Sequence, residues 1–284
     1  MPEAVTATRI IDLDLWEGRL PKLVDTYRNG KPFPFIALDD LLDPAAALQA
    51  QQASPRVQDE GWIHYVHVNE KKHGLNKMER LPPYLATVIQ KLNSDRFVRF
   101  LEKLTGVNGL HADEALEGGG LQQSRRGGFL NIHTDFNVHP HKRNWKRRVN
   151  VLLYLNKNWD AAWGGDLELW ERDMSACVQK FSPVFNRCVV FTTDEDTYHG
   201  VPDPITCPEN ETRKSIALHY YTLEEKAPRM RTTNYRPRPT DGTKAMAIRL
   251  DIQAIAVYTR VKRLFGMNDD LISNVLNVFG GKRK

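Results

Sequence analysis

Short β-rich segments, separated by Gly, Pro, Asn and Asp, fill the middle of the chain between residues 120 and 222. These candidate strands are Leu121–Gln123, Phe129–Thr134, Arg148–Leu155, Asp166–Trp170, Cys188–Thr192 and Ser215–Thr222. Many short strands at this density, with turn residues between them, are typical of a β-sandwich or barrel, and a jelly roll is one way to close such a sheet. The sequence therefore predicts a mainly β core.

Residues 1–110 have a mixed α/β pattern and are expected to support this core. The stretch Pro32–Leu38 reads as a short strand, and an Ala-rich run after Asp43-Pro44 reads as a helix start. Apolar residues recur at helical spacing in Tyr84–Leu92 and again in Asp95–Leu104. We expect these two amphipathic helices to pack against the outside of the core sheet, so the fold class is α+β with flanking helices.

Positive charge is concentrated at the C-terminal end of the chain. Residues 242–284 hold eight Lys or Arg and three Asp, so they account for the whole net charge of +5. The neutral remainder argues against an enzyme with a basic groove for nucleic acid. Residues 228–284 read as a connector rich in Pro, Arg and Thr followed by a basic helical hairpin. That hairpin could pack on its own domain, join two subunits in a homodimer or rest on an anionic membrane surface.

Cysteine usage and hydropathy indicate where the protein resides. The three cysteines are odd in number and form no C-x-x-C pair, so they indicate neither a disulfide framework nor a zinc site. The N-terminal residues lack the basic and then apolar run of a signal peptide. No apolar stretch approaches the ~18 residues of a membrane span. We therefore expect a cytoplasmic protein with no transmembrane segment, organised as residues 1–110, a core of residues 111–227 and the tail of residues 228–284.

The segment Asn131–Asp135 carries a His and an Asp two residues apart. Because side chains alternate along a strand, His133 and Asp135 are predicted to point the same way. An imidazole nitrogen and a carboxylate oxygen are two ligands of the 2-His-1-carboxylate triad that holds non-haem Fe(II) and leaves coordination positions open. His199, which follows the strand Cys188–Thr192 across an acidic loop, is the candidate third ligand from a separate strand.

Arg213 and Ser215 lie two residues apart on an apolar strand further along the chain. A guanidinium in a sheet interior needs an anionic partner, because an unpaired buried charge is very costly. The carboxylate of a bound small molecule matches the guanidinium fork through two hydrogen bonds. Ser215 lies one repeat along the same face and can donate a further hydrogen bond.

The order His133-x-Asp135, then His199, then Arg213-x-Ser215 resembles the Fe(II)/2-oxoglutarate-dependent dioxygenases, whose core is a double-stranded β-helix (jelly roll). The local sequence similarity is greatest to the prolyl-4-hydroxylase-like branch of that superfamily. It lies in the segments Tyr154-Leu-Asn-Lys-Asn-Trp159, Gly164-Gly-Asp-Leu-Glu-Leu169 and Tyr198-His-Gly-Val201. The resemblance covers about residues 118–222.

The resemblance implies a role for each matching residue. His133, Asp135 and His199 would bind Fe(II), and Arg213 would bind the distal carboxylate of 2-oxoglutarate with help from Ser215 and Tyr154. Gln123 stands where this branch places another contact to the co-substrate. The implied reaction consumes 2-oxoglutarate and O2, with ascorbate as a candidate reductant, and releases succinate and CO2. It would hydroxylate an unactivated C–H bond of a prolyl or other amino-acid residue.

Two other functions remain open from the sequence. The first is a tailoring hydroxylase of a small metabolite, sugar or lipid-linked intermediate, for which the basic run Lys142–Arg148 would be an anionic-substrate handle. A charged, solvated loop is the ordinary interpretation of that run, and also of His139 and His141 just before it. The second is a cupin-type metal-binding jelly roll, which has no reason to carry the Arg213-x-Ser215 pair.

Overall fold

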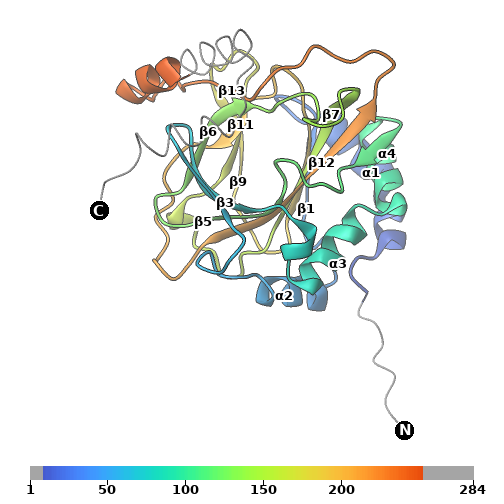
Figure 1. Cartoon of the computed structure of the whole chain (residues 1–284). Helices are drawn as coiled ribbons and strands as arrows, with labels where there is room; N and C mark the ends of the chain where they lie inside the picture. Colours follow the sequence, from blue (N-terminus) through green and yellow to red (C-terminus); the bar gives the residue numbers. More distant parts are fainter. Residues whose placement is uncertain (1–8, 252–284) are drawn as a thin grey trace.

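The computed structural model describes residues 9–251, and its centre is one antiparallel sheet of 13 strands curled into a half-barrel (Figure 1). The strands are β1 (Phe35–Leu38), β2 (Ile63–His67), β3 (Glu70–Leu75), β4 (Leu110–Ala112), β5 (Gly120–Ser124), β6 (Phe129–Thr134), β7 (Trp145–Tyr154), β8 (Leu167–Trp170), β9 (Cys177–Phe181), β10 (Cys188–Thr192), β11 (His199–Val201), β12 (Arg213–Leu223) and β13 (Asn234–Tyr235). The helices are α1 (Leu13–Arg28), α2 (Pro44–Gln52), α3 (Pro83–Leu92) and α4 (Asp95–Thr105), with short 3-10 turns at Met78–Arg80 and Ala161–Trp163. The prediction of a mainly β core with flanking helices is confirmed.

The sheet forms two walls that face each other. One wall has the strand order β1-β10-β7-β12-β5, and the other has the order β6-β11-β8-β9. Strand β3 joins them, because residues 73–75 pair with β5 whereas residues 70–71 pair with β6. Strand β2 continues the sheet as a hairpin partner of β3. The side chains on the inner faces of the two walls therefore point toward one another.

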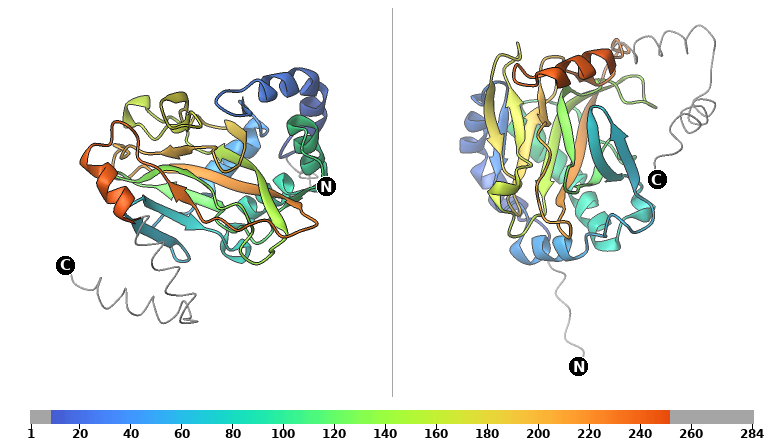
Figure 2. Two further views of the ribbon diagram at one scale, coloured as in Figure 1. Left: turned by 90° about the horizontal axis from the view of Figure 1, so that it is seen from above. Right: turned by 90° about the vertical axis from the view of Figure 1, so that its left-hand side faces the viewer.

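Helices α1 to α4 cover the outside of the first wall, as Figures 1 and 2 show. Both predicted amphipathic helices are present as α3 and α4. Helix α4 begins where the Ser94 hydroxyl accepts a hydrogen bond from the Phe97 amide, and it ends at Gly106, whose φ of 75° favours glycine. Helix α1 was not predicted from the sequence, because it has no clean apolar stripe and contains Pro21.

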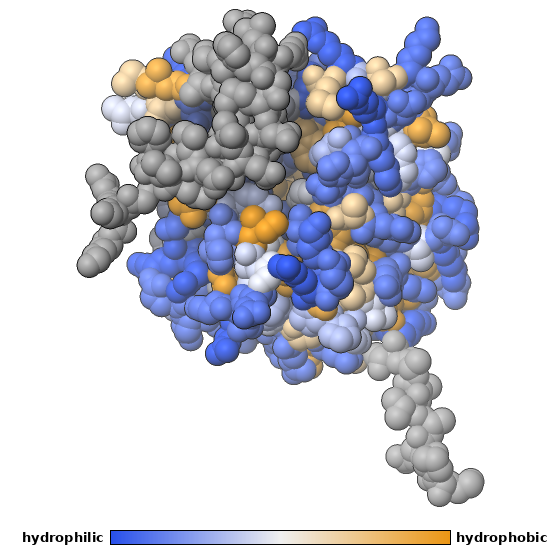
Figure 3. Space-filling model, in the orientation of Figure 1, coloured by the Kyte–Doolittle hydropathy of each residue, from blue (hydrophilic) through white to orange (hydrophobic). Residues whose placement is uncertain are grey.

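Apolar side chains gather in two main clusters. The larger cluster lies between the helices and the first wall and includes Phe100 and Leu101 of α4. The smaller cluster lies between the two walls, and its members are Phe33, Tyr154, Leu167, Leu169, Phe181, Val189 and Phe191. The face drawn in Figure 3 is mainly hydrophilic, with its apolar residues scattered, in keeping with burial of most apolar area in these clusters.

The helix–sheet cluster is expected to determine much of the stability. Phe100 is fully buried, so replacing it by alanine removes apolar contacts and leaves a cavity. Phe100→Ala should lower the free energy of unfolding by about 3–5 kcal/mol in chemical denaturation. Arg99→Ala, at the exposed neighbouring position, should stay within about 0.5 kcal/mol of the parent. Equal effects of the two substitutions would contradict the assignment of this cluster as the core.

The chain after β12 returns to the second wall, where β13 pairs with β6. Residues 243–251 are helical, so the first predicted tail helix begins as expected. The rest of that helix and the second helix of the predicted basic hairpin fall outside the described residues. In the part of the chain that the structure describes, no helix has the length and apolar character needed to cross a membrane.

Candidate metal centre

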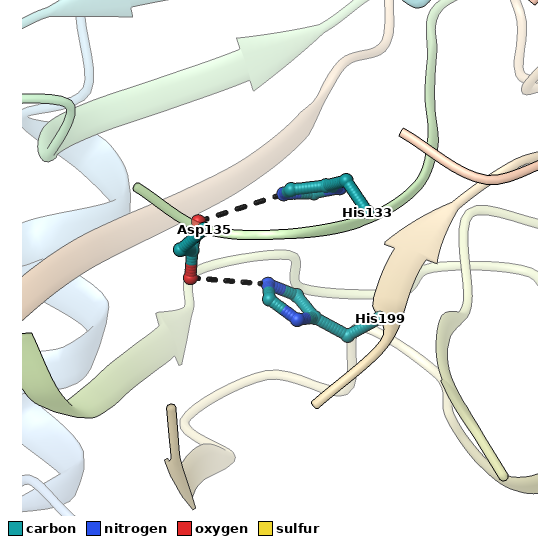
Figure 4. A group of neighbouring side chains, drawn as sticks. All are labelled: His133, Asp135 and His199. Atoms are coloured by element: carbon teal, nitrogen blue, oxygen red, sulfur yellow. Dashed lines mark ion pairs between the residues drawn. The ribbon is translucent and has the colours of Figure 1, made fainter. Parts of the chain in front are cut away.

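The three predicted metal ligands meet on the inner face of the second wall. His133 lies at the end of β6 and His199 begins β11, and these two residues are directly paired in the antiparallel ladder. Asp135 follows β6 and turns toward both imidazoles, as Figure 4 shows. Its Oδ1 atom lies 3.6 Å from Nε2 of His133, and its Oδ2 atom lies 3.4 Å from Nε2 of His199. One ligand atom from each residue falls within 4.8 Å of the others.

Backbone carbonyl groups fix how the two imidazoles are turned. Nδ1 of His133 donates a hydrogen bond to the Asn131 carbonyl at 2.8 Å, and Nδ1 of His199 donates to the Thr197 carbonyl at 3.0 Å. A histidine that donates through one ring nitrogen presents the other nitrogen as a lone-pair donor. Both Nε2 atoms are therefore free to bind a cation at the position that Asp135 faces.

The protonation states of the buried ligands also suit a cation. Burial lowers the pKa of His199 to about 4, which leaves this imidazole neutral at pH 7. Burial alone would raise the pKa of Asp135, but the positive charge of Arg147 and the neighbouring histidines hold it well below its usual value. A neutral imidazole and an ionised carboxylate need not lose protons before binding a metal ion. The donor set of two nitrogens and one oxygen fits Fe(II).

A cavity of about 220 Å³ opens beside these three residues and reaches Arg213 and Ser215 on β12. The Arg213 side chain is buried; its Nε donates to the Gly165 carbonyl at 2.7 Å, and its Nη2 donates to the Tyr154 hydroxyl at 3.3 Å. Position 165 favours glycine, because its φ is +84° and a Cβ atom would lie 3.1 Å from Cδ of Arg213. Within residues 9–251, no carboxylate lies within 4.0 Å of this guanidinium. The cavity therefore contains a buried cation that can accept an anionic ligand.

Tyr154 and Gln123 have different positions relative to this cavity. Tyr154 is fully buried, and its ring lies 4.9 Å from Cζ of Arg213. Gln123 points away, since it donates to the Pro55 carbonyl and accepts a hydrogen bond from Thr212. It is paired with Lys214, whereas its neighbour Gln122 is paired with Ser215 and lines the cavity. Directly paired residues share a face of the sheet, so Gln122 faces the cavity and Gln123, the predicted co-substrate contact, does not line it.

Parts of the chain outside the predicted motifs complete the walls of the cavity. Tyr65 and Lys72 of the β2–β3 hairpin line it. Thr233 and Tyr235 line it from the C-terminal side, and the Tyr235 ring lies 5.5 Å from the His133 ring. Residues 233–235 were predicted to be part of a connector, because a two-residue strand such as β13 has no periodicity that identifies it.

The basic run Lys142–Arg148 is the predicted solvated loop only in its first half, residues 142–144. Its second half belongs to β7, and the Arg147 side chain is buried, with Nη2 3.0 Å from Oδ2 of Asp135. His139 is also buried and pairs with Asp113 at 3.2 Å, whereas His141 is exposed as expected.

Comparison with known protein families assigns the core of the chain. Residues 119–221 match the family model described as the 2OG-Fe(II) oxygenase superfamily. Two curated relatives are the prolyl hydroxylase EGLN3 of Mus musculus, 31% identical over 100 residues, and that of Homo sapiens, 33% identical over 82 residues. The alignments cover 35% and 28% of this chain. The chain spans 39% and 32% of the length of these relatives.

Solved structures share the fold. One is a prolyl hydroxylase from Trichoplax adhaerens in complex with a hypoxia inducible factor oxygen degradation domain peptide fragment, with a TM-score of 0.51 and 21% identity over 76% of this chain and 93% of that one. Another is a prolyl 4-hydroxylase from Phytophthora capsici, with a TM-score of 0.50 and 20% identity over 80% of this chain and 71% of that one.

The curled antiparallel sheet, with two histidines and an aspartate facing an internal cavity, has the double-stranded β-helix fold of these solved structures. Residues 119–221 thus match the 2OG-Fe(II) oxygenase superfamily, and this part of the chain is similar in sequence to prolyl hydroxylases. The cofactor and co-substrate of this family are Fe(II) and 2-oxoglutarate. The His–Asp–His donor set fits the metal ion, and the buried guanidinium of Arg213 fits the dicarboxylate.

Proposed function

We propose that the protein is an Fe(II)- and 2-oxoglutarate-dependent hydroxylase that acts on a prolyl or other amino-acid residue of a polypeptide. The observation that carries the proposal is the juxtaposition of His133, Asp135 and His199 with the buried Arg213 across one cavity. A cupin-type metal protein would explain the first three residues but not the guanidinium, whose burial without an anionic partner would be costly.

Each residue has a definite task in this proposal. His133, Asp135 and His199 hold Fe(II) through two nitrogens and one oxygen. Arg213 binds the distal carboxylate of 2-oxoglutarate through its fork, with Ser215 as a second donor and Tyr154 positioning the guanidinium through its hydroxyl group.

When bound, Fe(II) and 2-oxoglutarate supply the activation of O2, so that one oxygen atom enters succinate as CO2 leaves and the other becomes the new hydroxyl group of the substrate. The protein binds and orients the reactants and excludes water from them. Leu152, Leu167 and Phe191 provide apolar lining, and Tyr235 covers one face of the His133 imidazole. An apolar, closed site strengthens the electrostatic contacts within it and limits side reactions.

A polypeptide substrate is supported by the curated relatives, both of which are named prolyl hydroxylases. The matched region contains the metal site and Arg213, whereas the β2–β3 hairpin and residues 233–235 lie outside the family match. The family match therefore does not cover the whole wall of the cavity, and the identity of the hydroxylated residue has to be found by experiment.

The test has two stages. Anaerobic addition of 2-oxoglutarate to the Fe(II)-loaded protein should produce a visible metal-to-ligand charge-transfer band, and absence of the band would contradict the assignment of the metal and co-substrate site. Succinate release should then be measured with proline-containing peptides, free amino acids and glycans, with and without ascorbate. Peptide-dependent release matched by an equal amount of hydroxylated peptide is expected. Coupled release with a sugar or free amino acid alone would instead indicate a tailoring hydroxylase.

A further inference from the structure

We propose that Arg147 and Asn150 form a clamp that holds the Asp135 carboxylate in position between the imidazoles of His133 and His199. Both are positioning residues that act through Asp135. The inference rests on the proposed function, because it requires Asp135 to be a metal ligand.

The clamp is a closed triangle of polar contacts. Nη2 of Arg147 lies 3.0 Å from Oδ2 of Asp135, and the Asn150 amide donates to the same oxygen at 2.8 Å. Nε of Arg147 donates to the carbonyl oxygen of the Asn150 side chain at 2.9 Å. All three side chains are shielded from solvent, with that of Arg147 only 3% exposed. Each member therefore restrains the other two, and the carboxylate has little freedom to rotate.

A β-bulge in β7 makes the triangle possible. Tyr220 of β12 is paired with Val149 and Tyr221 is paired with Arg147, so Arg148 is an extra residue with no partner in the ladder. In a regular strand, residues 147 and 150 would lie on opposite faces. The extra residue reverses the alternation and brings Arg147 to the inner face, while Arg148 bonds Thr222 and Glu224 on the other side.

Each carboxylate oxygen of Asp135 faces one imidazole, since Oδ1 lies 3.6 Å from Nε2 of His133 and Oδ2 lies 3.4 Å from Nε2 of His199. Oδ2 has two close donors, Arg147 and Asn150, which is as many as its lone pairs readily accommodate. These two donors therefore fix the carboxylate at the position where both imidazoles face it.

The alternative is that Arg147 and Asp135 form a buried ion pair that only stabilises the fold. The two interpretations predict different metal affinities for a variant that keeps the positive charge of Arg147 but loses its planar guanidinium group. A lysine retains the charge but is a single point donor, which cannot contact both Asp135 and Asn150 as the planar guanidinium does.

The experiment measures Co(II) affinity of the full chain by visible absorption, so it does not depend on turnover. Arg147→Met, Arg147→Lys and Asn150→Leu are compared with the parent, and thermal unfolding of each metal-free variant monitors its folding. Arg148→Met is the matched control, because it removes the same charge from the adjacent residue on the opposite face. If Arg147→Met does not fold, Arg147→Lys provides the same comparison.

We expect each variant of the clamp to weaken Co(II) binding by about 10- to 100-fold, as loss of a residue that orients a metal ligand typically does. Arg148→Met should stay within about threefold of the parent. Combining Arg147→Met with Asn150→Leu should weaken binding little more than the worse single substitution, because the two residues act as one unit. Full recovery of affinity in Arg147→Lys, or tighter binding in Arg147→Met, would overturn the clamp. Failure of the parent itself to bind Co(II) would instead contradict the proposed function.

Discussion

Replacing His133, Asp135 or His199 by alanine is expected to lower 2-oxoglutarate-dependent succinate formation by about a thousandfold or more, since the loss of metal-derived stabilisation is worth several kcal/mol. Each substitution removes one of the three ligand atoms that lie within 4.8 Å of one another. Two protein ligands cannot hold the ion in a fixed geometry, so co-substrate binding and oxygen activation should fail together.

The measurement is succinate release together with the metal content of each purified variant. His141→Ala is the matched control: it also removes an imidazole, but that side chain is 73% exposed and pairs only with Glu117 in the described structure. The control should keep parental activity and metal content. Full turnover by any of the three ligand variants would contradict the assignment of the metal centre, whatever the true substrate is.

The core of the fold could be predicted from the sequence because its signals are local and dense. Strands β5, β6, β7, β8, β10 and β12 were each identified within a few residues of their observed bounds, from β-rich runs between turn residues. Helices α3 and α4 have clean apolar stripes and were identified for the same reason. Elements without such signals were missed: α1 is polar, β11 has three residues and β13 has two.

The positions of site residues could be predicted only where strand alternation is regular. Alternation correctly related His133 to Asp135 and Arg213 to Ser215, because the irregularity of β6 lies before His133 and none interrupts the start of β12. It could not find Arg147, since the bulge at Arg148 reverses the alternation of β7 and nothing in the residue types marks that bulge.

Gln123 and His139 show a second limit of the sequence. Gln123 was predicted to contact the co-substrate from the family resemblance alone. The register of β5 against β12 turns its neighbour Gln122 toward the cavity instead. His139 was interpreted as solvated because its surroundings are polar, whereas it pairs with the buried Asp113 from a loop 26 residues earlier. Register and contacts between distant loops depend on tertiary structure, which a single sequence does not encode in any local pattern.

Arg213→Met is expected to weaken binding of 2-oxoglutarate to the metal-loaded protein by about a hundredfold or more, because hydrogen bonds to a charged group contribute roughly 1.5–3 kcal/mol each. Methionine fills a similar volume but offers no donor to the distal carboxylate. The metal ligands lie on the opposite wall of the cavity, so metal affinity should remain close to that of the parent. The 2-oxoglutarate affinity of Arg213→Lys should lie between those of the parent and Arg213→Met, since lysine keeps the charge but loses the paired donors.

In the metal-free protein, the substitution Arg213→Met should have little effect on thermal stability, in contrast to its effect on 2-oxoglutarate binding. Arg213 has no carboxylate partner within 4.0 Å in residues 9–251, so its burial without ligand is an electrostatic cost only partly offset by its bonds to Gly165 and Tyr154. The melting temperature of metal-free Arg213→Met is therefore not expected to fall much below that of the parent, although its ligand binding is lost. Lys214→Met is the matched control, because Lys214 follows directly in β12 and its ammonium group bonds the Thr212 carbonyl on the other face. Loss of 2-oxoglutarate affinity in Lys214→Met, or its retention within about threefold in Arg213→Met, would show that the buried guanidinium is not the co-substrate anchor.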